Sequence, residues 1–128
     1  MLFKRQEPFR YTFSQPIKGE IYCIEEKGKV TSTNRESVEI LDLSPSGLKI
    51  KSTENFQISS HIRYSFQFSL DGELIQTTAY PIWKTNQFHY FIYGFKMEQS
   101  DTEKQAIIET LKQYSKKQHQ LLKEKDKK

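Results

Sequence analysis

Residues 61–72, with the sequence HIRYSFQFSLDG, carry the clearest structural signal in the chain. Apolar side chains occupy every second position from Ile62 to Leu70, and polar side chains fill the positions between them. This period of two is typical of a β-strand that buries one face. The dipeptide Asp71-Gly72 follows directly, and the apolar pattern then resumes. We therefore expect a tight β-hairpin with a positive φ at Gly72.

The sequence on both sides of this hairpin predicts further antiparallel strands. The expected strands cover residues 11–24, 37–43, 47–51, 61–70, 74–83 and 88–97. Pro81 has no backbone donor and predicts a sheet edge or a bulge, and Gly94 predicts a bend or a close backbone approach. About six strands at short spacing favour a small, mostly β barrel. Several aromatic residues are expected in its core: Phe66, Phe68, Trp83, Phe88 and Phe91.

The pattern changes at Ser100, where the sequence Ser-Asp-Thr-Glu fits a capping box at the start of a helix. Apolar residues then recur at helical spacing, at Ile107, Ile108, Leu111 and Tyr114. We expect a helix over residues 100–122 that packs onto the barrel. The charged tail at residues 123–128 is expected to fray.

Composition indicates one domain that covers residues 1–128, with barrel residues 11–98 and an N-terminal arm at residues 1–10. The formal charge of +4 is modest and fits a local anion site better than a broad nucleic-acid surface. The lone Cys23 allows no internal disulfide, which favours a reducing, cytoplasmic environment. We expect no signal peptide and no membrane span.

Residues 42–47 form a D-x-S-x-x-G sequence between two predicted strands, with Asp42, Ser44 and Gly47 at the defined positions. These residue types are ordinary turn formers, in which Asp and Ser cap local backbone groups and Gly supplies a positive φ. They are also able to hold the edge of a small polar ligand. A carboxylate accepts hydrogen bonds, a hydroxyl adds a second polar contact, and glycine lets the backbone approach the ligand closely.

This sequence, with arginines before the first strand, resembles the PilZ domain, a bacterial receptor module for cyclic di-GMP. The resemblance covers nearly all of the chain. The D/N-x-S-x-x-G motif of that family is matched in full, but its R-x-x-x-R motif is matched only in part. Arg10 corresponds to the second arginine, Gln6 replaces the inner first position, and Arg5 lies one residue further out. The resemblance implies a six-stranded antiparallel split barrel with a C-terminal helix.

The resemblance also implies a ligand site formed by Arg5, Arg10, Asp42, Ser44 and Gly47, with Lys4 and Gln6 as secondary contacts. Guanidinium groups pair bidentately with phosphate oxygens or with guanine O6 and N7, whereas Asp42 would accept from the guanine Watson–Crick edge. Ligand binding would then order residues 1–10 and signal to a partner protein. No other cofactor is expected.

Other functions stay open at this point. Gln6 has no charge to offer a phosphate, so the chain could be a degenerate PilZ domain that acts only as a protein-interaction adaptor. A barrel that stacks single-stranded nucleic acid is less favoured, because its aromatic residues alternate as a core face does. An enzyme is not expected: His61, His89 and His119 are isolated, and no metal-ligand spacing or Gly-rich phosphate loop occurs.

Overall fold

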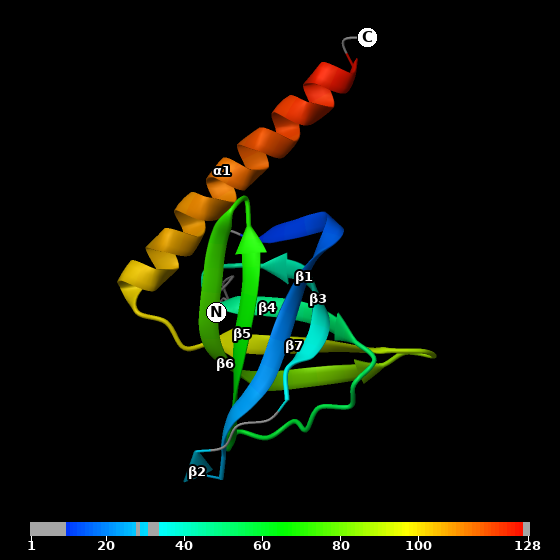
Figure 1. Ribbon diagram of the computed structural model, residues 1–128, viewed down its shortest axis with the longest axis vertical. Coiled ribbons are helices and arrows are strands. Elements are labelled where there is room, and N and C mark those ends of the chain that lie inside the picture. Colours follow the sequence, from blue (N-terminus) through cyan, green and yellow to red (C-terminus); the bar gives the residue numbers. More distant parts are fainter. Residues whose placement is uncertain (1–9, 28, 31–33, 127–128) are drawn as a thin grey trace, which may run out of the picture.

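The computed structural model describes residues 10–27, 29–30 and 34–126, and these residues form a barrel with one long helix at its flank (Figure 1). The elements are β1 (Tyr11–Glu26), β2 (Lys29–Val30), β3 (Glu36–Leu43), β4 (Gly47–Ser52), β5 (Ile62–Leu70), β6 (Glu73–Asn86), β7 (Phe91–Met97) and α1 (Asp101–Asp126). Within the described residues, no helix is both long enough and apolar enough to cross a lipid bilayer.

The strands follow the order β2-β1-β3-β4-β7-β6-β5, and an additional pairing of β1 with β5 closes the sheet. All pairings are antiparallel. β1 is long enough to serve two neighbours, because its first part pairs with β3 and its second part pairs with β5. The two-residue β2 only extends the far end of β1. The predicted six-stranded antiparallel barrel with a C-terminal helix is therefore confirmed.

The hairpin predicted at Asp71-Gly72 joins β5 to β6. Leu70 and Glu73 form the last cross-strand pair, which leaves two residues in the loop. Gly72 has a φ of 82°, and Asp71 has a φ of 55°. Positive φ at both central residues is the type I′ geometry, whose twist matches the twist of the flanking strands.

Aromatic rings fill the barrel interior. Phe66 and Phe95 meet edge to face with ring centroids 4.7 Å apart, and Tyr64 contacts Phe95 in the same geometry at 5.7 Å. Phe66 and Phe68 are buried as predicted, and Phe91 is partly buried against the core. The prediction was wrong for Phe88, which is 92% exposed in the turn before β7 begins.

One buried tyrosine has a pKa that bears on the stability of the barrel in alkali. Tyr64 is only 5% exposed, and its hydroxyl donates to the Gln57 carbonyl oxygen at 3.3 Å. Burial is the main cause that raises the pKa of Tyr64 from 10.0 to about 12. In the unfolded chain this phenol ionises near its ordinary pKa, so its contribution to stability is present below pH 10 and is lost as the pH rises through 12.

We therefore expect the free energy of unfolding to fall between pH 10 and pH 12, because ionisation of Tyr64 favours the unfolded chain. Urea denaturation across this range, with tyrosinate absorbance as a second signal, measures the effect. Tyr64→Phe retains the ring but not the ionisable group, so its stability should depend less steeply on pH. An identical pH profile for this variant would show that other groups cause the alkaline loss.

The helix begins with the predicted capping box. The Glu103 side chain accepts from the Ser100 backbone N–H at 2.8 Å, and the Ser100 hydroxyl accepts from the Glu103 backbone N–H at 3.2 Å. The other end differs from the prediction, because α1 continues beyond residue 122 to Asp126. Leu, Lys and Glu, which dominate residues 121–125, are strong helix formers and favour this continuation.

We expect Ser100→Ala to lower the free energy of unfolding by about 1 kcal/mol, because the substitution removes one half of the reciprocal cap. Urea denaturation measures this change. Ser115→Ala is the matched control, because the same substitution inside the helix interior is close to neutral or slightly stabilising. Equal losses in both variants would contradict a role of the cap.

The first half of α1 packs on the barrel beside the start of β1. Ile107 and Leu111 are buried in the core, and Tyr114 meets both Tyr11 and Phe13 edge to face at 5.6 Å. The second half of the helix projects beyond the barrel (Figure 1). These contacts hold the start of β1, and with it the residue that precedes β1, against the stretch of α1 from Ile107 to Tyr114.

Candidate functional site

The D-x-S-x-x-G sequence forms the turn between β3 and β4. The Gly47 carbonyl oxygen accepts from the Ser44 backbone N–H at 2.9 Å and from the Ser44 hydroxyl at 3.3 Å. Ser44 is fully buried, so its hydroxyl closes the turn. Gly47 lacks the positive φ that the ordinary-turn interpretation assigned to it. A Cβ at Gly47 would meet Ser44 Oγ at 3.4 Å and the Phe95 carbonyl oxygen at 3.5 Å. Sterics within the chain alone therefore do not require a glycine at this position.

A β-bulge places Asp42 beside this turn. Val38 and Ile40 belong to the apolar core and are two positions apart, so the alternation predicts position 42 as the next core residue. The next apolar core residue is instead Leu43. The register between β3 and β4 shifts between Ile40 and Asp42, which is the shift that a bulge produces. Asp42 consequently lies outside the apolar interior, and its register partner on β4 is Lys49.

Two cations share the Asp42 carboxylate. Arg10 Nη1 lies 2.6 Å from Oδ1, and Lys49 Nζ lies 3.4 Å from Oδ2. The Asp42 side chain is only 4% exposed, whereas the Arg10 and Lys49 side chains are 48% and 40% exposed. A nearly buried charge needs such partners. Because both cations keep part of their surface in solvent, they are also accessible to an external anion.

A second bulge brings Trp83 to the same face. The register between β6 and β7 shifts between Pro81 and Trp83, which confirms the bulge that Pro81 predicted. The shift turns Trp83 out of the core, so the prediction of a core tryptophan was wrong: its side chain is 41% exposed. Trp83 is the register partner of Gly94, and its ring lies over that residue. A Cβ at Gly94 would lie 2.8 Å from Trp83 Cδ1 and closer still to the ring nitrogen. This is the close approach that Gly94 predicted.

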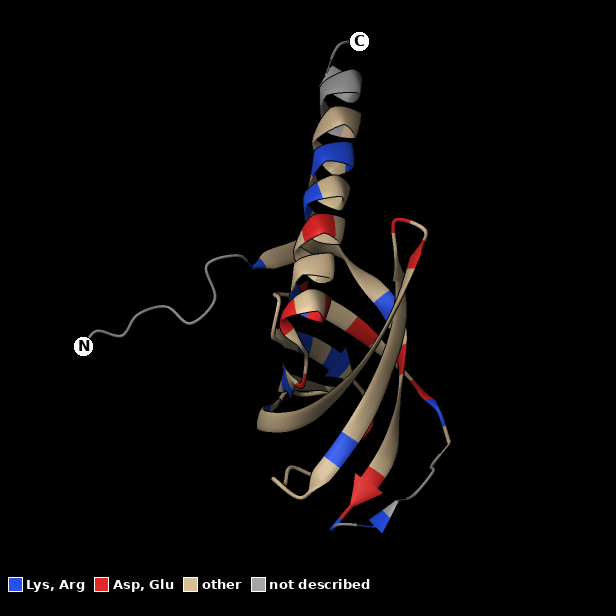
Figure 2. Cartoon of the chain, turned by 90° about the vertical axis from the view of Figure 1, so that its left-hand side faces the viewer, with Lys and Arg blue, Asp and Glu red and all other residues tan. Residues whose placement is uncertain are grey.

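Together these residues line an open cleft of about 650 Å³. The structure brings Arg10, Asp42, Ser44 and Gly47 into this cleft, whereas Lys4, Arg5 and Gln6 lie outside the described residues. Several lining residues were not predicted from the sequence: Lys49, Ile82, Trp83, Lys96 and Lys104. In Figure 2, basic positions on the strands lie near the start of α1. Four cations and one carboxylate among its lining residues give the cleft a net positive charge, which favours an anion.

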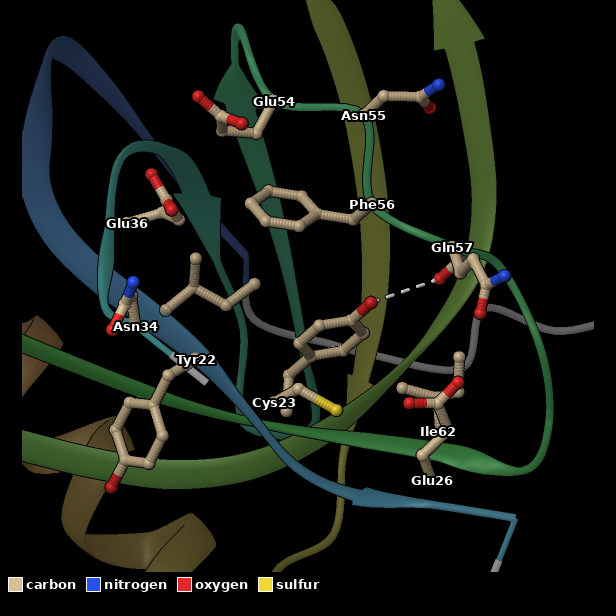
Figure 3. A pocket seen from close by; sticks show the side chains of 12 residues that line it. Tyr22, Cys23, Glu26, Asn34, Glu36, Glu54, Asn55, Phe56, Gln57 and Ile62 are labelled. Atoms are coloured by element: carbon tan, nitrogen blue, oxygen red, sulfur yellow. Dashed lines mark hydrogen bonds between the residues drawn. The ribbon is translucent and has the colours of Figure 1, made fainter. Parts of the chain in front are cut away.

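A separate cavity of about 400 Å³ lies at the far end of β1 (Figure 3). Cys23 and Tyr64 form part of its wall, and burial raises the pKa of the Cys23 thiol. The charged residues that line this cavity are Glu26, Glu36 and Glu54, so it does not suit a phosphate. Among the described residues, no group of three or more His, Cys, Asp or Glu side chains is arranged to hold a metal ion.

The family model of the PilZ domain matches residues 4–116. The chain belongs to the PilZ domain family. This match includes the arginine-bearing segment, the barrel and the first part of α1, and it confirms the resemblance inferred from the D-x-S-x-x-G sequence. No curated protein sequence matches the chain significantly.

Solved structures of other PilZ proteins share the fold of this domain. The PilZ domain of YcgR from Escherichia coli with c-di-GMP has a TM-score of 0.63 at 13% identity, over 92% of this chain and 98% of that one. The PilZ domain of CeSA from a cellulose-synthesizing bacterium has a TM-score of 0.56 at 19% identity, over 78% and 91% of the two chains. The Bacillus subtilis inhibitor of motility, MotI/DgrA, has a TM-score of 0.64 at 13% identity, over 93% of this chain.

The similarity to larger relatives covers only part of their length. The chain spans 53% of MotI/DgrA and 50% of the YcgR chain whose structure was solved in complex with c-di-GMP. At these identities the likeness establishes the barrel and its helix. The chemistry of the cleft has to be argued from the residues of this chain.

Proposed function

We propose that this PilZ domain is a receptor for cyclic di-GMP that signals to a partner protein. The observation that supports the proposal best is the group formed by Arg10, Asp42 and Lys49 at the D-x-S-x-x-G turn. Cyclic di-GMP carries two phosphates and two guanines, so it needs cations for the former and a hydrogen-bond acceptor for the Watson–Crick edge of the latter. The cleft offers both kinds of group side by side.

Each residue of the cleft has a distinct part in this proposal. Arg10 pairs with a phosphate or with the Hoogsteen edge of a guanine. Asp42 accepts from the guanine N1–H and N2–H groups, and Lys49 continues to balance its charge. The half-exposed ring of Trp83 offers an apolar face on which a base can stack. Gly47 keeps the backbone open toward the ligand.

The N-terminal arm completes the proposed site. Arg10 directly precedes β1 and lies in the cleft. The N-terminal arm therefore joins the barrel at the proposed ligand site. The five residue steps from Arg10 back to Arg5 can span at most about 17 Å when extended, and this limits how far Arg5 can lie from Arg10. We propose that binding orders residues 1–10 and that the ordered arm is read by the partner. We also propose that the domain binds its ligand without catalysis. A cytoplasmic location is part of the proposal, and the single Cys23 is consistent with a reducing compartment.

Titration calorimetry with cyclic di-GMP tests the proposal. Trp83 is the single tryptophan of the chain and lines the cleft, so its fluorescence gives an independent signal from the site itself. We expect saturable heat and a change in Trp83 emission over the same range of ligand concentration. The absence of both signals at tens of micromolar ligand would exclude the receptor function.

One observation favours a second candidate, a degenerate PilZ domain that serves only as a protein-interaction adaptor. Asp42 is almost fully covered and already neutralised by Arg10, while Gln6 supplies no further charge. Gln6→Arg separates the two candidates. A silent wild-type protein together with a binding Gln6→Arg variant would identify a lost site, whereas binding by the wild type rejects this candidate.

A further inference from the structure

Two lysines in the cleft form no ion pair with any residue that the structure describes. Lys96 on β7 and Lys104 on α1 line the cleft together with Arg10 and Lys49. Arg10 and Lys49 share Asp42, whereas no ion pair involving Lys96 or Lys104 occurs within the part of the chain that the structure describes. The uncompensated positive charge of the cleft therefore lies on the side of β7 and α1.

The backbone holds both lysines close to the D-x-S-x-x-G turn. Lys96 is the register partner of Gly47. Lys104 is partly buried, and its backbone N–H donates to the Ser100 carbonyl oxygen at 3.0 Å in the capped start of α1. A cation near the N-terminus of a helix interacts unfavourably with the helix dipole. Helix stability therefore gives no reason for a lysine at position 104.

The turn is also bonded directly to the segment that leads into α1. The Ser46 carbonyl oxygen accepts from the Met97 backbone N–H at 2.8 Å. The Pro45 carbonyl oxygen accepts from the Gln99 side-chain amide at 3.0 Å. A ligand held at the turn is thus only a few bonds away from the start of the helix.

We infer that Lys96 and Lys104 bind the phosphates of the nucleotide, so that α1 forms one wall of the ligand site. This inference rests on the proposed function. It supplies from β7 and α1 the positive charge that Gln6 does not provide on the N-terminal arm. A phosphate held by both lysines connects the ligand to the first turns of α1. The helix then responds to binding together with residues 1–10.

Removal of the Lys104 charge tests the inference. We expect Lys104→Gln to weaken binding of cyclic di-GMP about fivefold in calorimetry, the upper end of the range for one partly exposed charge pair. Lys104→Arg should stay within about twofold of the wild type, because it retains the charge. Lys112→Gln is the matched control, since Lys112 is an exposed lysine of the same helix that does not line the cleft. Unchanged melting temperatures verify that all variants fold.

Hydrogen exchange provides a second readout. In the wild type, cyclic di-GMP should slow exchange of the backbone amides of residues 101–108, and this protection should be smaller in Lys104→Gln. If the wild type binds cyclic di-GMP, and Lys104→Gln binds it equally well with the same protection, this inference alone is overturned. Equal weakening in Lys104→Gln and Lys112→Gln also overturns it, because the effect would then reflect overall charge. A wild type that does not bind overturns both this inference and the proposed function.

Discussion

Arg10→Ala is expected to weaken binding of cyclic di-GMP by about 3 kcal/mol, or roughly a hundredfold. Arg10 reaches into the cleft from the residue before β1 and lies 2.6 Å from the Asp42 carboxylate. Its removal eliminates one or two charge-assisted hydrogen bonds to the ligand. It also frees Asp42 to repel the phosphates, because among the described residues Lys49 alone then balances that carboxylate. Titration calorimetry measures the change in affinity.

The same substitution should lower the free energy of unfolding by about 1–2 kcal/mol, because Asp42 is nearly buried and loses its closer partner. Arg35→Ala is the control at an exposed pair: Arg35 pairs with Glu20 at 2.9 Å, and both side chains of this pair are about half exposed, with Arg35 also lying over the Tyr22 ring. Such an exposed pair contributes less than about 1 kcal/mol, and it lies outside the cleft. Wild-type affinity in Arg10→Ala would reject the role of this arginine. It would not change the identity of the ligand.

Elements whose signals are local could be predicted from the sequence. The Asp71-Gly72 turn and the cap at Ser100 each depend on residues within a few positions of one another, and both have the predicted geometry. The end of α1 was placed too early, because the expectation relied on the loss of an apolar stripe. Helix propensity alone favours the continuation to Asp126.

The candidate site was predictable only where its residues are close in sequence. Asp42, Ser44 and Gly47 belong to one turn, but Lys49 joins Asp42 through the register of β3 and β4. The apolar spacing from Ile40 to Leu43 breaks the period of two and signals the bulge that sets this register.

Trp83 shows how one bulge changes which residues at the end of a strand face the core. Thr77, Ala79 and Pro81 are buried, and the same alternation continued to residue 83 predicts a buried ring. Pro81 predicts the bulge, and an extra residue at Ile82 reverses the faces that follow it. Combining the two predictions would have placed Trp83 outside the core. No sequence pattern, however, indicates that Lys104 lines the same cleft as Gly47, since this depends on how α1 docks.

Gly94→Ala is expected to displace the Trp83 ring and to weaken binding of cyclic di-GMP at least tenfold. A Cβ at Gly94 overlaps the ring, and a residue in the middle of β7 has no room to move away from its neighbours on β4 and β6. The ring must therefore leave its position and enter solvent or the cleft. Fluorescence should detect this change as a red shift of the Trp83 emission in the absence of ligand, and calorimetry measures the affinity.

The barrel itself should survive the substitution, because Gly94 has no positive φ and alanine is at least as favourable as glycine in a strand. We expect a loss of about 1–2 kcal/mol in the free energy of unfolding from the exposed ring surface. Gly47→Ala is the matched control for fluorescence, since its Cβ meets neighbours only at 3.4 Å or more and leaves Trp83 in place. An unshifted emission in Gly94→Ala would mean that the backbone of β7 yields instead of the ring.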